Sequence, residues 1–328
     1  MTVDRTDATG GTDGADGTSA AEKADGRAAD WTAARFQEHR AHLRSVAYRM
    51  LGSLTEADDA VQEAWLRLSR SGDADVQNLR AWLTTVVSRV CLDMLRSRAA
   101  RREDSLDVHV PDPVVTRADD DPQEHALLAD SVGLALLIVL DTLSPTERLA
   151  FVLHDVFGVP FDQIGAVLDR SPAAAKQLAS RARRRLRGAA PPAAQPAAAP
   201  PDRAEAARQR RVVEAFQAAS AAGDFEALLA VLDPDIVLRA DAGASPAGPS
   251  QVIRGAEAVI AQAGRFAALA RYAHPVLVNG GPGVLVAPGG QPFALLAVTV
   301  AGDRISEIDI LADPERLARL GLADLIES

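Results

Sequence analysis

A basic stretch in the middle of the chain has residue types and spacing suited to binding phosphates. In residues 160–187 (PFDQIGAVLDRSPAAAKQLASRARRRLR), apolar residues recur at helical spacing, and Ser171 followed by Pro172 predicts the start of a second helix. That helix holds six basic residues and no acid, in a chain of formal net charge -10. Because segregated positive charge attracts nucleic-acid phosphates, we predict a helix-turn-helix whose second helix enters a major groove. The alternative is a solvated basic face that closes a domain.

The two sides of this second helix differ in character. Leu178, Ala182 and Leu186 recur at helical spacing and predict the buried side. The outward side, which would face DNA, consists of Lys176, Gln177, Ser180, Arg181, Arg183, Arg184 and Arg187.

Size and composition bound the rest of the chain. Its 328 residues suffice for two or three domains, and a content of 48% hydrophobic but 4% aromatic residues predicts helices packed through Ala, Val and Leu. The single cysteine, Cys91, excludes a disulfide framework and a cysteine metal cluster, so we expect a cytoplasmic protein with no metal and no cofactor. The longest apolar run, residues 132–140, is too short to span a bilayer, so we expect no membrane segment.

Periodicity and composition outline the elements that position the basic helix. Residues 1–30 are acidic and rich in Gly, Ala and Thr, so we expect a disordered tail. Residues 31–103 predict a helical domain. Residues 104–123 are acidic and contain prolines, which predicts an extended, self-repelling linker. Helices resume over residues 124–188, where Ser144 and Glu147 form a capping box.

The last third of the chain has a different period. Residues 189–203 form a Pro/Ala tether. Beyond it, two helices precede strand-like runs at residues 236–240, 275–278, 283–287, 293–300 and 304–311. Gly-rich turns separate the later runs, so we expect an antiparallel sheet packed on helices in residues 204–328. The predicted fold class is multidomain: two all-α domains, the second with a helix-turn-helix, followed by an α+β domain.

Several segments together resemble a known family. They are TEADDAVQEAWLRL (55–68), AWLTTVVSRVCLDMLRSRAARRE (81–103) and SPTERLAFVLHDVFGVPFDQIGAVLDRSPAAAKQLASRARRRLR (144–187). Their order and spacing are similar to those of extracytoplasmic-function sigma factors, the two-domain promoter-recognition subunits of bacterial RNA polymerase. Residues 204–328, with DPDIVLRAD (233–241), VNGGPGV (278–284) and DPERL (313–317), resemble the SnoaL-like (NTF2-like) extension of one subgroup, a cone-shaped α+β domain.

The resemblance implies a protein that is not an enzyme but binds core RNA polymerase and promoter DNA and initiates transcription. Residues 31–103 would be sigma region 2 and residues 124–188 sigma region 4. An acidic helix face in region 2 would dock on the clamp helices of polymerase. The residues implied for this face are Asp58, Asp59, Gln62, Glu63, Trp65 and Leu68. The alternative is a solvated helix face, with Trp65 in the core.

Two further sets of residues are implied to contact the promoter. The helix over residues 79–102 and the loop at 71–78 would capture the -10 element, which requires polar pockets and a cationic groove. The candidates are Asn78, Arg80, Arg89 and Arg96. The recognition helix would read the -35 element through Lys176, Gln177, Ser180, Arg181 and Arg184. Region 4 would also meet a polymerase subunit on the -35 side.

The resemblance also implies regulation in cis by the C-terminal domain. In the subgroup the linker threads the RNA path of polymerase, and its proline motif pairs with an Asp-Gly-Gly-Gly-Lys motif in the extension. Here the linker has Pro111, Asp112 and Pro113, and the extension has Asp241 followed by Ala-Gly-Ala-Ser, so the lysine and two glycines are replaced. These four residues are the regulatory candidates. A small-molecule ligand in the C-terminal pocket is left open.

Two other functions are left open. SnoaL-like folds include cyclases and isomerases that place an acid or base in a conical pocket. The candidates for that role are Asp241, His274, Arg239 and Asp309. The second is a ligand-responsive helix-turn-helix regulator, which would have no need of an acidic polymerase-binding face.

Overall fold

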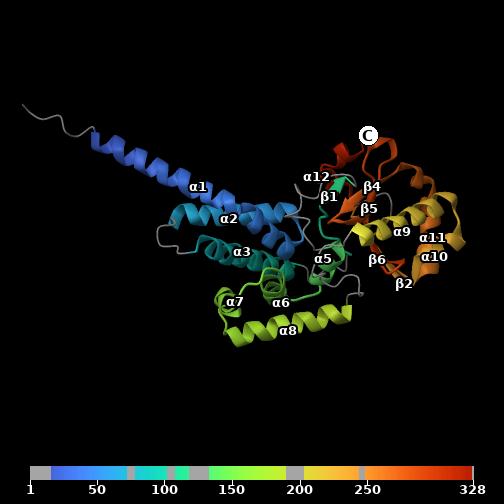
Figure 1. Ribbon diagram of the computed structural model, residues 1–328, viewed down its shortest axis with the longest axis horizontal. Helices are drawn as coiled ribbons and strands as arrows, with labels where there is room; N and C mark the ends of the chain where they lie inside the picture. Colours follow the sequence, from blue (N-terminus) through green and yellow to red (C-terminus); the bar gives the residue numbers. More distant parts are fainter. Residues whose placement is uncertain are drawn as a thin grey trace, which may run out of the picture.

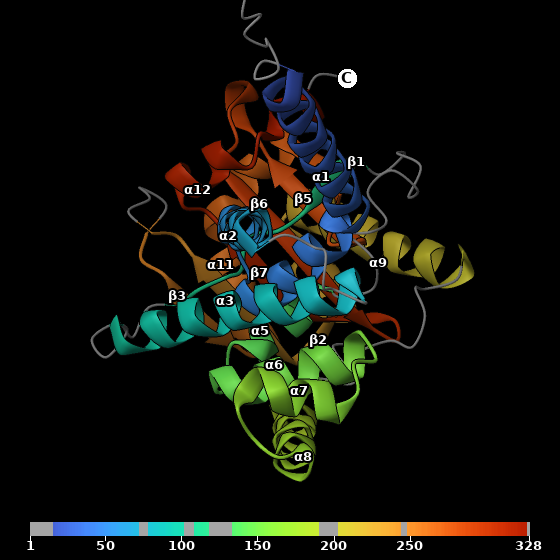
Figure 2. The same cartoon turned by 90° about the vertical axis from the view of Figure 1, so that its left-hand side faces the viewer.

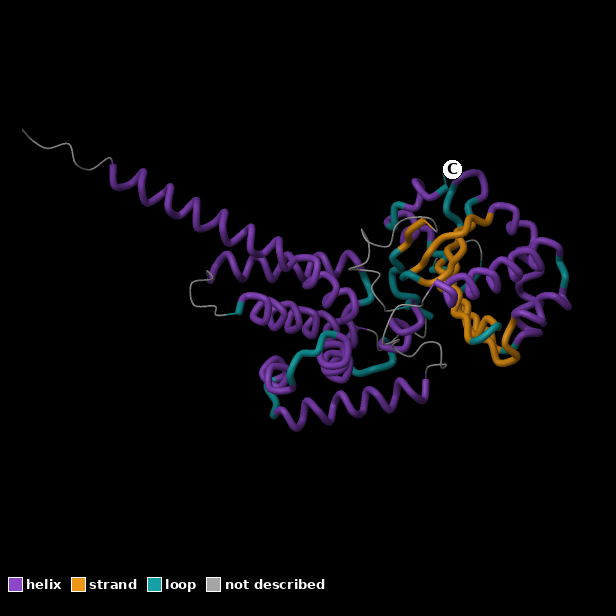
Figure 3. Tube along the Cα trace, viewed as in Figure 1, coloured by secondary structure: helices purple, strands orange, loops and turns teal. Residues whose placement is uncertain are grey.

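The computed structural model describes residues 16–71, 78–101, 108–117, 133–189, 203–243 and 248–326. A helical half adjoins a half that contains the sheet (Figure 1). The strands gather in the second half, with helices around them (Figure 3).

Three helices form the first domain: α1 (Asp16–Leu51), α2 (Leu54–Ser71) and α3 (Leu79–Arg101). Leu43, Leu68 and Leu83, one from each helix, are fully buried where the helices meet. Because α1 begins at Asp16, the disorder predicted for residues 1–30 is wrong for residues 16–30, whereas residues 1–15 lie outside the described residues. Residues 19–29 are rich in Ala and include Glu22, Lys23 and Arg27, and these residue types have high helix propensity.

The second domain holds α5 (Leu134–Leu140), α6 (Pro145–Phe151), α7 (Phe161–Leu168) and α8 (Pro172–Ala189). The predicted capping box is confirmed, because Ser144 Oγ accepts from the Glu147 amide and the Glu147 carboxylate accepts from the Ser144 amide. A π-helical turn, Val152–Val156, continues α6. α6 and α7 pack against α3 (Figure 2). The helix predicted to start at residue 124 lies outside the described residues as far as residue 132.

Within the described residues, the C-terminal domain contains seven strands in the order β1-β4-β5-β6-β7-β2-β3. They are β1 (Val115–Arg117), β2 (Leu232–Asp241), β3 (Gln251–Arg254), β4 (Ala273–Val278), β5 (Gly281–Val286), β6 (Ala294–Ala301) and β7 (Arg304–Leu311). β2 and β7 are parallel, and the other neighbours are antiparallel. The predicted antiparallel sheet is therefore wrong at this pair. A parallel pair needs a long crossover, which the chain between β2 and β7 supplies.

β1 comes from the segment predicted to be a self-repelling linker. Its Val115 pairs with Val278 of β4, so residues 108–117 pack against the C-terminal domain instead of standing free. This part of the linker contains one acid, Asp112, which is why repulsion does not hold it apart. The more acidic parts, residues 104–107 and 118–123, lie outside the described residues.

The two faces of the sheet pack against different partners. One face is covered by α9 (Arg203–Ala222), α10 (Phe225–Val231), α11 (Ala256–Ala263) and the 3-10 helix η3 (Gly264–Tyr272). The other face contributes to a continuous core that includes both helical domains. Its members include Val276, Val278, Leu285, Leu295 and Leu311. The C-terminal domain therefore shares a hydrophobic core with the helical half.

Candidate nucleic-acid interface and linker clamp

The turn between α7 and α8 depends on a glycine and a left-handed residue. Asp169 ends α7 with a φ of 53°, and the Arg170 amide donates to the Gly165 carbonyl at 2.9 Å. A Cβ at Gly165 would lie 2.6 Å from the Arg170 carbonyl oxygen, so only glycine fits without a shift. Ser171 Oγ accepts from the Ala174 amide at 3.2 Å, which confirms the predicted N-cap.

Ion pairs to α6 hold α8 in place. Arg185 Nη1 lies 2.6 Å and Arg181 Nε 3.4 Å from oxygens of Glu147, the capping-box carboxylate. Burial opposes ionisation of Glu147, but hydrogen bonds from Ser144 and the charges of Arg185 and Arg181 outweigh it and lower its pKa. One carboxylate therefore both starts α6 and orients α8.

All residues of the predicted -35 set lie on the exposed side of α8, and they are Lys176, Gln177, Ser180, Arg181 and Arg184. Arg181 already shares Glu147, and its neighbour Arg183 pairs with Asp155 at 2.7 Å. Lys176 and Arg184 have no ion pair within the described part of the chain. These two cations can reach an external phosphate without breaking an internal pair.

The acidic residues of the predicted polymerase-binding set are partly engaged within the protein. Asp58 accepts from Arg44 at 2.8 and 3.0 Å, and Glu63 pairs with Arg67 at 2.9 Å. Asp59 is exposed, as is Gln62 between these two pairs. The exposed part of this face is thus narrower than the predicted set.

The two apolar residues of that set lie further inside. Trp65 is half-buried, and the centroid of its ring lies 5.1 Å from that of Phe36. Its side chain therefore packs partly against the core and is partly exposed. Leu68 is 0% exposed, and its predicted place on the binding face is wrong. Helical spacing sets Leu68 on the stripe of Val61 and Ala64, which packs inward.

The predicted -10 set lies exposed along α3, and its members are Asn78, Arg80, Arg89 and Arg96. Asn78 Oδ1 accepts from the Ala81 amide at 3.0 Å and so caps the helix. Arg96 lies 3.6 Å from Asp93. Residues 72–77 of the predicted capture loop lie outside the described residues.

Two of these arginines connect α3 to other helices. Arg89 donates to the Ala166 carbonyl of α7 at 2.7 Å, so it bridges the two helical domains in this conformation. Arg80 Nη2 lies 3.3 Å from His42 Nδ1 on α1. Burial and the charge of Arg80 lower the pKa of His42 to about 4, so this ring is neutral near neutral pH.

Arg316 of α12 (Pro314–Arg319) holds the linker in place, and we call its cluster with Val110, Asp112 and Asp241 the linker clamp. Arg316 donates to the Val110 carbonyl at 2.6 Å, to Asp112 Oδ1 at 3.0 Å and to Asp241 Oδ2 at 2.7 Å. Asp241 Oδ2 also accepts from the Val110 amide at 2.9 Å. The side chains of Arg316 and Asp241 are only 10% and 9% exposed, and in such surroundings charged hydrogen bonds are stronger than in water.

A second group of hydrogen bonds ties the same linker to the first domain. The Tyr48 hydroxyl donates to the Asp112 carbonyl at 2.6 Å and accepts from Asn279 Nδ2 at 3.0 Å. Asn279 Oδ1 accepts from the Val114 amide at 2.9 Å, and the Asp112 amide donates to the Gly52 carbonyl at 2.8 Å. Burial raises the pKa of Tyr48 above its usual range, so the hydroxyl keeps its proton.

The structure thus brings together the four predicted regulatory residues, Pro111, Asp112, Pro113 and Asp241, with both prolines buried. Sequence reasoning missed Arg316, Asn279 and Tyr48. The first two stood inside recognised segments, DPERL and VNGGPGV, and a cation near Asp241 could have been sought once the motif's lysine was seen to be replaced. Tyr48 carried no signal, since it lies on an ordinary apolar helical stripe.

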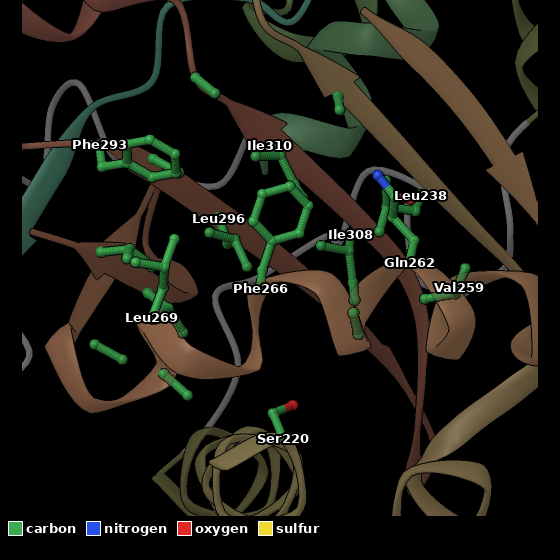
Figure 4. A pocket seen from close by; sticks show the side chains of 18 of the residues that line it. Ser220, Leu238, Val259, Gln262, Phe266, Leu269, Phe293, Leu296, Ile308 and Ile310 are labelled. Atoms are coloured by element: carbon green, nitrogen blue, oxygen red, sulfur yellow. The ribbon is translucent and has the colours of Figure 1, made fainter. Parts of the chain in front are cut away.

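An apolar cavity of about 180 Å³ lies between the sheet and its covering helices (Figure 4). Its described lining residues include no ionisable side chain. The catalytic candidates Asp241, His274, Arg239 and Asp309 are not among them. Instead, Arg239 pairs with Asp309 and Glu307 at 2.9 Å each, and burial raises the pKa of Asp309 to about 6. None of the helices in the described ranges is long and apolar enough to cross a membrane.

Comparison with known families assigns the two helical domains. The model for sigma-70 region 2 matches residues 35–101, and that for sigma-70 region 4 matches residues 134–186. The class of protein is therefore a sigma factor, with the helix-turn-helix in region 4.

Full-length relatives narrow the class. The ECF RNA polymerase sigma factor SigJ of Mycobacterium tuberculosis is 39% identical over 298 residues, which cover 86% of this chain and 91% of SigJ. The probable ECF sigma factor SigI of the same species is 36% identical over 297 residues, covering 88% and 95%. The crystal structure of SigJ matches with a TM-score of 0.68 and 34% identity over 87% of this chain and 98% of that one.

This chain belongs to the extracytoplasmic-function (ECF) sigma factors, and its C-terminal domain has the α+β fold predicted from the sequence. The resemblance stated from the sequence is confirmed. Its function is that of an RNA polymerase sigma factor, which implies binding of core polymerase and of promoter DNA.

Proposed function

We propose that the NTF2-like domain regulates this sigma factor in cis by restraining its linker. The observation that carries the proposal is the contact of Arg316 with Val110, Asp112 and Asp241. A linker held by buried, charged hydrogen bonds is not available to another partner. In the family, this linker enters polymerase, so release of the clamp must precede full engagement and the clamp acts as a brake.

The test compares Arg316→Met with Arg319→Met, since Arg319 lies on the same helix but is exposed. Removing one partner of a buried ion pair costs about 3 to 5 kcal/mol, enough to free the linker. We expect Arg316→Met to raise run-off transcription at limiting core polymerase, and Arg319→Met to leave it unchanged. A milder variant, Asp112→Asn, covers the case in which Arg316→Met folds poorly. Wild-type transcript yields from folded Arg316→Met and Asp112→Asn would refute the brake.

We further propose that the exposed residues of α8 read the -35 element and that those of α3 contact the -10 element. The support is their exposure and the unpaired charge of Lys176 and Arg184. The exposed part of α2, around Asp59 and Gln62, would meet the polymerase clamp. The protein would work in the cytoplasm, where polymerase and promoters are.

The NTF2-like domain is proposed to be regulatory and not catalytic. General acid–base chemistry requires an ionisable group within hydrogen-bond reach of the substrate. No described residue that lines the cavity supplies one. A cavity of this kind suits binding of a small molecule more than its conversion.

A further inference from the structure

The cavity in the NTF2-like domain is too large to be a packing defect of an ordinary core. Natural cores contain few voids larger than a water molecule. At about 180 Å³, this cavity exceeds an engineered apolar cavity of about 150 Å³ that stays dry and binds benzene. Its walls are aliphatic and aromatic side chains from the sheet, α11 and η3, among them Leu238, Ile308, Leu296 and Phe266 (Figure 4).

One polar group at the edge of this cavity lacks a partner. Ser220 projects from α9 toward the cavity, and its Oγ is buried with no hydrogen bond among the described residues. A buried hydroxyl without a partner is costly, and such groups are rare in native proteins. A ligand with one donor or acceptor at this position would satisfy it.

We propose that the cavity binds an uncharged, largely apolar small molecule of one or two rings, or of similar aliphatic size, whose single polar group meets Ser220 Oγ. A carboxylate, phosphate or ammonium is excluded as the buried group, because no described lining residue could compensate its charge. The other polar lining groups, Gln217, Gln251 and Gln262, are neutral amides.

The cavity and the linker clamp lie on opposite sides of the end of β2. Along β2 and the residue after it, Ala240 and Ala242 line the cavity, while Asp241 between them points to the opposite side and accepts from Val110. The Asp241 carbonyl accepts from the amide of Ala312, another cavity residue, at 2.7 Å. A ligand in contact with Ala242 and Ala312 therefore touches the two residues next to, and hydrogen-bonded to, the backbone of Asp241, whose side chain belongs to the linker clamp. This coupling rests on the proposed brake, whereas ligand binding itself does not.

Binding can be tested on the full chain with 2-naphthol, which has two fused rings and one hydroxyl. We expect saturable binding by fluorescence titration. Ala267→Phe, which fills the cavity, should weaken it more than tenfold, while Ala268→Phe, at the exposed neighbouring position, should not change it. Ser220→Ala should weaken 2-naphthol about threefold to tenfold, the range of one neutral hydrogen bond, and leave naphthalene unaffected.

Three results would overturn the site or its ligand class. They are no saturable binding of either uncharged probe, equal affinity in folded Ala267→Phe, and tighter binding of naphthalene-2-sulfonate than of 2-naphthol. Cooperative thermal unfolding identifies variants that fold. The coupling is measured separately, as hydrogen exchange of the backbone amides of Val110, Asp112 and Val114 with and without saturating 2-naphthol. A change of at least threefold supports it, and unchanged exchange alongside confirmed binding rejects the coupling. Transcription by Arg316→Met tests the brake independently of ligand binding and of the coupling.

Discussion

The Tyr48 hydroxyl accepts a hydrogen bond from Asn279 Nδ2 at 3.0 Å, across a sequence separation of 231 residues. This bond directly joins the first helical domain to the NTF2-like domain. The same hydroxyl donates to the Asp112 carbonyl, so the linker is tied to both domains at one point. Sigma region 2, the linker and the C-terminal domain are therefore coupled mechanically.

Tyr48→Phe should destabilise the protein and loosen the linker. The change removes one hydroxyl and leaves the Asp112 carbonyl and the Asn279 amide without that partner in a buried site. We expect a loss of about 1 to 3 kcal/mol in the free energy of unfolding. Denaturant titration measures it, with Tyr272→Phe as the control, because no hydrogen bond of the Tyr272 hydroxyl is seen within the described residues. Equal losses in the two variants would count against a special role for Tyr48.

Lys176→Ala and Arg184→Ala should each weaken promoter binding by the holoenzyme. Each lost phosphate contact should lower the slope of log affinity against log salt by about 0.9, and a lost base contact should cost about 1 to 3 kcal/mol and relax specificity. Arg181→Ala should show a similar loss together with lower stability, because it also gives up the pair with Glu147. Binding assays at several salt concentrations separate these cases. Wild-type binding by all three variants would show that α8 does not read the promoter.

The double variant Asp59→Arg with Glu63→Arg should lose assembly with core polymerase and keep its fold. It places cations where a basic partner surface would meet α2, and like-charge contact at an interface costs several kcal/mol. The matched control is Glu226→Arg with Asp235→Arg, which reverses two exposed acids of the NTF2-like domain. Pull-down of core polymerase checks both, and equal recovery by the two double variants would contradict the assignment of this face.

Asp309 should make the folded protein less stable as pH rises from about 4 to 6. Burial raises its pKa to about 6 from the ordinary value of 3.8, so the folded chain holds this proton more tightly than the unfolded chain does. The stabilisation is therefore fully present below about pH 4 and is lost as pH rises through 6. Subtracting the unfolding free energies of Asp309→Asn from those of the wild type isolates this contribution, because His42, whose pKa is lowered, is common to both. Asp303→Asn, at a largely exposed aspartate, is the control substitution.

Several elements could be predicted from the sequence because their causes are local. The capping box at Ser144 and the N-cap at Ser171 depend on side chains within three residues of the groups they bind. The basic side of α8 follows from helical spacing and from the lack of acids in that stretch. The later strands were marked by Gly-rich turns, and β7 has the predicted bounds, Arg304–Leu311.

Other features were decided by the tertiary structure, since their partners are far apart in the sequence. β1 lies in a segment predicted to be linker, and it is a strand because it pairs with β4. β2 pairs in parallel with β7, which lies more than 60 residues further along the chain. Arg316 and Val110 are 206 residues apart, so no local pattern could show that one holds the other. Local propensity determines where helices and strands begin, whereas only the packed chain determines which charges meet in the clamp.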